Sequence, residues 1–66
     1  NLIIKYVVYQ LKPIPLSIPV QQGLNKVYFS SVWNAFDTEK EALEVMSREL
    51  TDIQGYVILR EVNSVL

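Results

Sequence analysis

The 66-residue sequence contains no cysteine and no histidine. No disulfide can therefore form, and the usual ligand sets of a structural zinc site are excluded. A chain this short buries only about 60% of the surface that its unfolded form exposes, so small domains commonly depend on a disulfide, a metal or oligomerisation. The composition leaves oligomerisation, and we expect a homo-oligomer, a dimer or larger.

Catalytic equipment is also scarce. General acid and base catalysis would fall to carboxylates, lysine or tyrosine, because histidine and cysteine are absent. The sequence shows no P-loop, no GxGxxG, no triad motif and no metal-ligand spacing. We therefore expect a protein that is not an enzyme and has no catalytic residues, metal or cofactor.

Neither charge nor hydropathy points to nucleic acid or a membrane. Seven acidic residues oppose six basic ones, giving a formal net charge of −1, which lacks the positive footprint of a nucleic-acid binder. No apolar run approaches the ~20 residues of a transmembrane helix. We expect a soluble, cytoplasmic protein that does not bind a membrane.

What the sequence has in excess is apolar residues, which make up 50% of the chain. A domain of this size has little interior, so part of this surplus must lie on the surface. Exposed apolar surface of that kind is typical of an interaction site.

Three segments predict β-strands because they are rich in β-branched and aromatic residues: Leu2–Leu11, Lys26–Trp33 and Tyr56–Val62. The first is apolar on both faces, as in a strand that is covered on both sides. Its two sets are Ile3, Val7, Tyr9 and Leu11 on one face, and Leu2, Ile4, Tyr6 and Val8 on the other.

The segment Glu39–Ile53 predicts an amphipathic helix. Thr38 with Glu41 three residues later forms a capping-box pattern at its start, and Gly55 is placed to end it. The expected buried stripe, flanked by Val45, comprises Ala42, Leu43, Met46, Leu50 and Ile53.

This β-β-α-β order predicts one small α+β domain over residues 1–66. A hairpin makes the first two strands antiparallel, and the helix returns the chain so that the third strand lies antiparallel beside the first. The expected sheet is three-stranded and antiparallel in the order 2-1-3, with one helix on one face and a long proline-containing connection between the first two strands.

The connection "LKPIPLSIPVQQG" has a directional pattern. Its prolines, Pro13, Pro15 and Pro19, all have odd numbers, so in an extended strand they would remove N–H donors from one edge only. The even-numbered residues keep their donors and share a face. Two interpretations remain open: an irregular loop, or an ordered arm that covers a sheet face or contacts another subunit.

These patterns favour a non-enzymatic protein-interaction module that acts as a homo-oligomer, a design that suits a small regulator or inhibitor of phage or bacterial origin. Its expected interaction surface comprises Ile14, Leu16, Ile18, Val20, Tyr28 and Trp33.

Two alternatives come from the aromatic and basic residues. The first is binding of a nucleotide-like small molecule at a subunit interface, with Tyr6, Tyr9, Lys5, Lys26 and Arg60 as its contacts. The second is single-stranded nucleic-acid binding, in which aromatic residues would stack on bases, although the acidic balance disfavours it.

Overall fold

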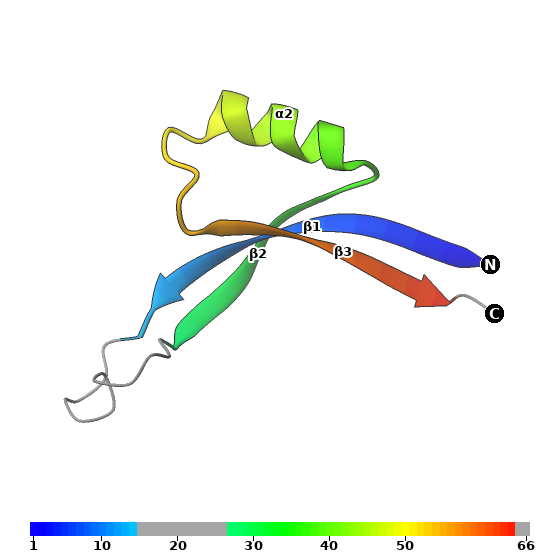
Figure 1. The fold of residues 1–66 in the computed structure, drawn as a ribbon, viewed down its shortest axis with the longest axis horizontal. Coiled ribbons are helices and arrows are strands. Elements are labelled where there is room, and N and C mark those ends of the chain that lie inside the picture. The colour runs from blue at the N-terminus through cyan, green and yellow to red at the C-terminus, as the bar shows by residue number, and fades with distance from the viewer. Residues whose placement is uncertain (15–26, 65–66) are drawn as a thin grey trace.

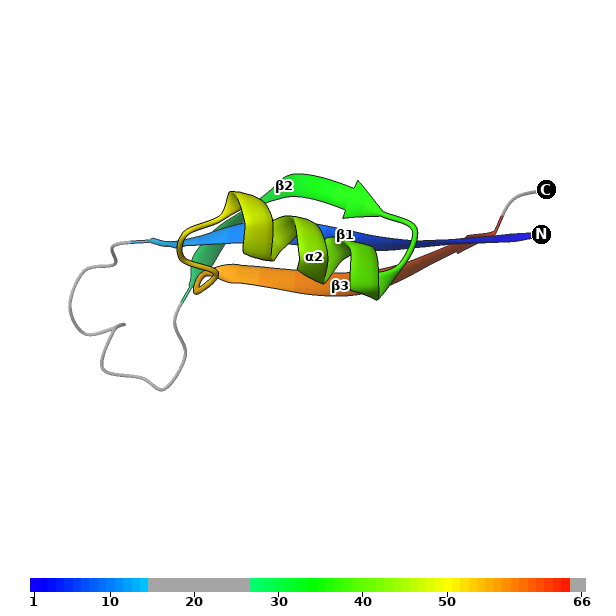
Figure 2. The ribbon, with the colours of Figure 1, turned by 90° about the horizontal axis from the view of Figure 1, so that it is seen from above.

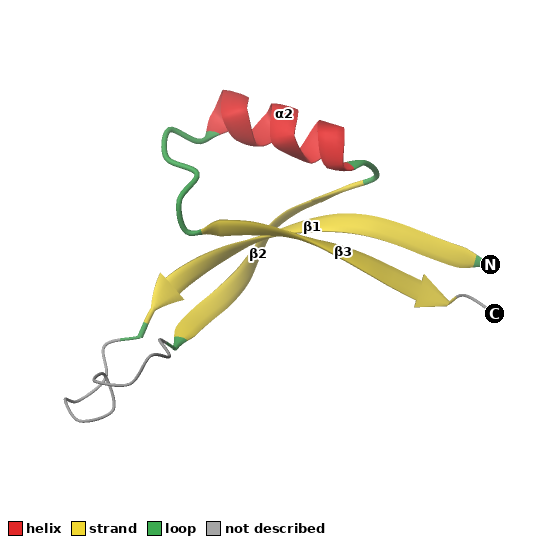
Figure 3. Cartoon of the chain, in the orientation of Figure 1, coloured by secondary structure: helices red, strands yellow, loops and turns green. Residues whose placement is uncertain are grey.

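The computed structural model describes residues 1–14 and 27–64. In chain order the elements are β1 (Leu2–Pro13), β2 (Tyr28–Phe36), α2 (Glu39–Glu49) and β3 (Tyr56–Ser64). Figures 1 and 3 show a twisted sheet with the helix on one side. The α+β class and the β-β-α-β order are those predicted.

The sheet has the order β2-β1-β3, and both neighbours run antiparallel to β1. The strand with two apolar faces therefore lies in the centre, as expected. β3 pairs with β1 residue for residue from Tyr56 opposite Gln10 to Ser64 opposite Leu2.

A β-bulge interrupts the pairing of β1 with β2. Val8 lies opposite Asn34, whereas the next residue, Tyr9, lies opposite Val32, so Trp33 is the extra residue. The Asn34 side chain accepts a hydrogen bond from the Ala35 N–H at 2.8 Å. The predicted end of this strand at Trp33 is wrong because the bulge lets the strand continue to Phe36, through Asn34 and Ala35, which are residue types that are uncommon in strands.

Thr38 caps α2, as predicted: its Oγ1 accepts a hydrogen bond from the Glu41 N–H at 3.1 Å. The predicted helix end is wrong, because α2 stops at Glu49 and Leu50 is already extended. Beyond it, the Asp52 carboxylate accepts a hydrogen bond from the Gln54 N–H at 2.9 Å. Such local side-chain bonds compete with helix continuation.

Gly55 does not end the helix. Its φ of 85° belongs to the turn that leads into β3, a conformation that glycine adopts without steric cost. The Gly55 carbonyl accepts a hydrogen bond from the Leu11 N–H at 2.7 Å. This glycine therefore joins the start of β3 to the end of β1.

The core lies between the sheet and α2 and consists of Val8, Phe36, Ala42 and Met46. Around it pack Trp33, Val45, Leu50, Tyr56 and Ile58. Figure 2, which looks onto the helix, shows α2 lying across the sheet in front of β1 and β3. Its buried residues Ala42 and Met46 belong to one cluster with Val8 of β1 and Phe36 of β2. Two residues of the predicted buried stripe, Leu43 and Ile53, are instead 50% and 55% exposed. Ile53 lies beyond the end of α2, and the residues that α2 buries are Ala42 and Met46.

Candidate interaction surface

The face of the sheet opposite α2 carries no element of the described chain. Because Val8 packs against the helix, the even-numbered residues of β1 face α2 and the odd-numbered ones face away. Residues directly opposite one another share a face, so the register defines this open face. It consists of Ile3, Lys5, Val7, Tyr9 and Leu11 in β1, Tyr28, Ser30, Val32 and Ala35 in β2, and Val57, Leu59, Glu61 and Asn63 in β3.

Much of the open face is apolar and accessible. Val32 is 62% exposed, Leu59 50% and Val57 37%. Tyr28 and Ile3 are also exposed. Val7, between Ala35 and Leu59 in the register, is buried although it does not belong to the core cluster under the helix. The open face thus has a small packed centre of its own and an exposed apolar surround.

The charged groups of the open face gather towards the N-terminal end of β1. Lys5 forms a salt bridge with Asp37, with Nζ to Oδ1 at 2.5 Å. The Tyr9 hydroxyl donates a hydrogen bond to the Glu61 carboxylate, and this bond raises the pKa of Tyr9, with desolvation and the carboxylate charge acting in the same direction. Lys5, Glu61 and Tyr9 therefore all have partners within the chain.

The six residues of the expected interaction surface do not lie together on one surface in the described structure. Tyr28 lies on the open face, 45% exposed. Trp33 instead lies on the helix side, because it packs against the core with its ring 6.4 Å from Phe36 and 6.0 Å from Tyr56. Ile14 is half-buried, and its N–H donates to the Val27 carbonyl. Leu16, Ile18 and Val20 lie outside the described residues.

The expected ligand contacts do not share one face. Lys5 and Tyr9 lie on the open face, whereas Tyr6 and Arg60 pair directly on the helix side. Lys26 lies outside the described residues. The aromatic side chains are divided in the same way, so the tyrosines and basic residues within the described ranges 1–14 and 27–64 do not form a single stacking platform.

The predicted interaction surface did not include Val32, Val57 and Leu59. A signal for Val57 and Leu59 was present in the sequence. They are two residues apart in the third strand, so their side chains share one face of the sheet, as do the alternate apolar residues of the first strand. Val32 lies in the predicted second strand, but nothing in its surroundings in the sequence indicates that its face of the sheet stays uncovered.

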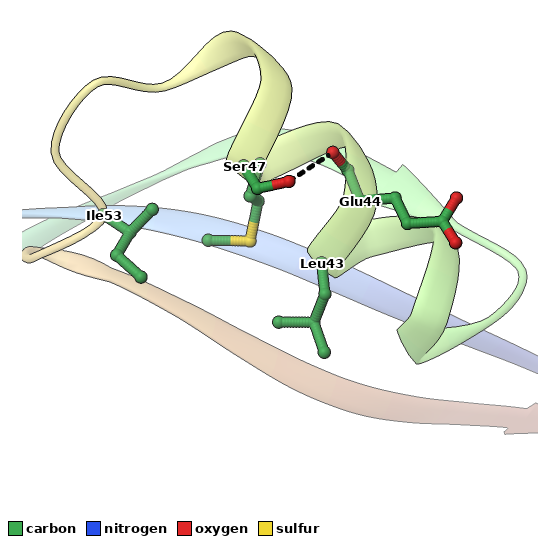
Figure 4. A pocket seen from close by; sticks show the side chains of 5 residues that line it. Leu43, Glu44, Ser47 and Ile53 are labelled. Atoms are coloured by element: carbon green, nitrogen blue, oxygen red, sulfur yellow. Dashed lines mark hydrogen bonds between the residues drawn. The ribbon is translucent and has the colours of Figure 1, made fainter.

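A second apolar feature lies beside the helix. A groove of about 400 Å³ is lined by Leu43, Glu44, Met46, Ser47 and Ile53. Figure 4 shows Leu43 projecting from α2 towards the strands and Ile53 from the segment that leads into β3. The Ser47 hydroxyl donates to the Glu44 carbonyl at 2.9 Å, which leaves an almost wholly apolar lining.

The described residues contain neither a candidate metal site nor a helix that could span a membrane. Residues 1–14 and 27–64 contain no group of three or more acidic, cysteine or histidine side chains that could hold a metal ion. Within the same part of the chain, α2 is too short to cross a bilayer, and no other helix there meets that length and hydropathy. Comparison with known proteins found no matching family model, no similar curated protein and no similar solved structure.

Proposed function

We propose that the protein is a non-enzymatic interaction module that self-associates through the open face of its sheet. The observation that carries this proposal is the set of five accessible apolar residues on that face: Ile3, Tyr28, Val32, Val57 and Leu59. A sheet normally buries one face against another layer, and an exposed apolar patch marks an interaction site. In the register, Val32 and Val57 lie opposite Tyr9 and Leu59 lies opposite Val7, whereas Ile3 lies beyond the Lys5–Glu61 pair.

The small core supports the same proposal. The buried hydrophobic residues of the described chain are Val7, Val8, Phe36, Ala42 and Met46. Fully burying a large aliphatic side chain contributes about 1.5–3 kcal/mol, so covering five partly exposed residues would add several contributions of about half that size. A partner on the open face therefore supplies stabilisation that the chain lacks by itself.

The charges on the open face are arranged as they are at protein interfaces, with an apolar centre and a polar rim. Lys5 and Asp37 neutralise one another, and Glu61 accepts a hydrogen bond from Tyr9. Covering Val32, Val57 and Leu59 consequently does not require an unpaired charge to leave water. A second copy is the simplest occupant, because a two-fold axis brings the same apolar patch to both sides of the contact.

The experiment compares the wild-type protein with Val32→Glu by light scattering after size-exclusion chromatography. Val32 is 62% exposed, so the variant is expected to fold, and a charge in the contact should weaken association by about tenfold or more. Phe29→Glu is the matched control, because Phe29 is 66% exposed in the same strand but faces the helix side, opposite Lys12.

We expect Val32→Glu to lower the oligomer mass and Phe29→Glu to leave it unchanged. A Val32→Glu variant with the wild-type mass at every concentration would exclude the open face as the contact, as would a monomeric wild type.

A further inference from the structure

The outer edge of β3 is the second surface of this chain that is built for a partner. We propose that two copies pair antiparallel along their β3 edges, forming one continuous six-stranded sheet with both helices on the same side. This contact uses the backbone edge of β3 rather than the apolar side chains of the open face, and a Val32→Glu background separates the two in the test.

β3 is a regular edge strand. It lies at the end of the sheet and pairs with β1 without interruption over its whole length, so its outer side presents a straight row of backbone donors and acceptors. The other edge strand, β2, carries the bulge at Trp33, a feature that twists an edge and discourages pairing. The two edges of the sheet are therefore unequal, and β3 is the one suited to strand addition.

β3 has few of the features that usually prevent an edge strand from pairing with another chain. Its sequence, "YVILREVNS", has no proline and only two charges, Arg60 and Glu61. The Glu61 carboxylate is held by the Tyr9 hydroxyl of the central strand. This hydrogen bond draws the charge back over its own sheet and away from the outer edge.

The apolar groove borders the same side of the sheet. α2 packs mainly against β1 and β2, and Leu43 and Ile53 remain 50% and 55% exposed beside β3. Val62, on the helix side of β3, is also exposed. A partner strand added at the β3 edge would bring its own helix-side residues next to this groove and reduce its exposure to water.

Charge complementarity identifies the occupant as a second copy. Glu44 lines the groove and Arg60 lies on the helix side of β3. Both are exposed, and neither forms an ion pair within residues 1–14 and 27–64. The Glu44 carboxylate points away from Leu43 and Ile53 (Figure 4), so it lies at the rim of the groove and not in its apolar lining. In a two-fold arrangement, Arg60 of each copy approaches the rim that carries Glu44 of the other, so the acid and the base are self-complementary.

The charges also select the register. A two-fold axis centred on Arg60 or on Glu61 would place like charges directly opposite one another, which is destabilising. An axis centred on Leu59 avoids both, because it places Leu59 opposite Leu59, Val57 opposite Glu61 and Ile58 opposite Arg60. The same register also pairs Tyr56 with Val62, so it covers most of the strand.

Cysteine cross-linking tests this register directly, because the natural sequence has no cysteine. The test uses the full chain carrying Val32→Glu, which removes the proposed open-face contact. Directly opposite residues of antiparallel strands lie about 4.5–5.5 Å apart between Cα atoms, within the range that a disulfide spans. Leu59→Cys should therefore form a disulfide-linked dimer under mild oxidation.

Val57→Cys is the matched control. Val57 is an aliphatic residue of the same strand and the same face, with 37% exposure against 50% for Leu59, but the register places it opposite Glu61. It should cross-link at least about tenfold more slowly, because the two Val57 positions then lie several residues apart. Equal rates for the two cysteines, or a faster rate for Val57→Cys, would overturn the proposed pairing.

Charge reversal provides a second readout on the helix side. In the Val32→Glu background, Glu44→Arg and Arg60→Glu should each weaken the dimer by about tenfold, because two symmetry-related contacts change from attraction to repulsion. The double variant Glu44→Arg with Arg60→Glu should restore it. Failure of the double variant to restore association would overturn the Glu44–Arg60 contact.

The two proposals fail differently. If Val32→Glu does not alter the mass but Leu59→Cys cross-links selectively, the open-face contact is excluded and the edge pairing stands. If Val32→Glu lowers the mass to that of a monomer, the open face is supported and the edge pairing is excluded. A circular-dichroism spectrum of Val32→Glu that matches the wild type guards against misfolding of that background, because Val57 and Leu59 lie on the open face and could cross-link there in the natural sequence.

Discussion

The Tyr9 hydroxyl donates a hydrogen bond to the Glu61 carboxylate diagonally across the open face, although the register pairs Tyr9 with Val57 and Glu61 with Lys5. The Lys5 ammonium turns to Asp37 instead. Two polar contacts thus extend from β1, one to Glu61 in β3 and one to Asp37, the residue that follows β2. Together they pair the charged groups at this end of the open face.

The Tyr9–Glu61 bond predicts a pH dependence of stability in the alkaline range. The bond raises the pKa of Tyr9 above its ordinary value of about 10. Because the pKa is higher in the folded state, folding favours the neutral hydroxyl. This contribution is complete below about pH 10 and is lost as the pH rises through the raised value.

We therefore expect the difference in unfolding free energy between wild type and Tyr9→Phe to be constant up to about pH 10 and to shrink above it. Urea unfolding at a series of pH values measures this difference. In tyrosinate absorbance, Tyr9→Phe should remove the ionisation step that lies above the ordinary range, and Tyr28→Phe is the control on the same face. Retention of that step in Tyr9→Phe would contradict the assignment.

The helix predicts a contrast between two of its apolar residues. Met46 is 5% exposed and belongs to the core, whereas Leu43 is 50% exposed in the groove. Met46→Ala should cost about 2–5 kcal/mol of unfolding free energy through lost burial and a cavity. Leu43→Ala should cost less than about 1 kcal/mol when measured in dilute protein, where association does not contribute. Similar losses for both variants would show that α2 sits differently on the sheet.

The start of α2 gives a third prediction. The Thr38 Oγ1 accepts the Glu41 N–H, one of the four N–H groups that lack a partner within the helix. Thr38→Ala should lower the unfolding free energy by about 1 kcal/mol, while Thr38→Ser keeps the acceptor and most of the stability. Thermal unfolding followed by circular dichroism compares the two. An alanine variant as stable as the serine variant would mean that the cap contributes little.

The fold could be predicted from the sequence because its patterns are long and consistent. The run Leu2–Leu11 is apolar on both faces, which favoured a central strand, and β1 is central. The expectation that both faces are covered is wrong for the described chain, because α2 covers only the face that carries Val8. The capping pattern at Thr38 placed the start of the helix correctly. Chain order and antiparallel pairing then left few arrangements, and the order β2-β1-β3 is the one found.

The errors arise where a local feature depends on the three-dimensional surroundings. The bulge at Trp33 is set by pairing with β1, and it allows both Trp33 and Phe36 to face the helix. The end of α2 is set by Leu50, which leaves the helical conformation and packs against the core. The candidate site was predicted only in part, with Tyr28, because exposure of Val32 and Leu59 depends on what covers the sheet, which no pattern in the strands themselves reveals.

The turn at Gly55 supports the last prediction. Its φ of 85° lies in the left-handed region, and an added Cβ would meet the Leu11 carbonyl oxygen at 3.5 Å, an ordinary contact. Gly55→Ala should therefore cost about 1–2 kcal/mol from backbone strain, without a steric clash. Gln54→Ala, the neighbouring exposed position, should change the stability by less than about 0.5 kcal/mol. Because the Gly55 carbonyl accepts the Leu11 N–H, hydrogen exchange at Leu11 should accelerate in Gly55→Ala and not in Gln54→Ala. Unchanged exchange at Leu11 in a destabilised Gly55→Ala variant would contradict this expectation. It would mean that strain in the turn lowers stability without weakening the hydrogen bond between Leu11 and Gly55.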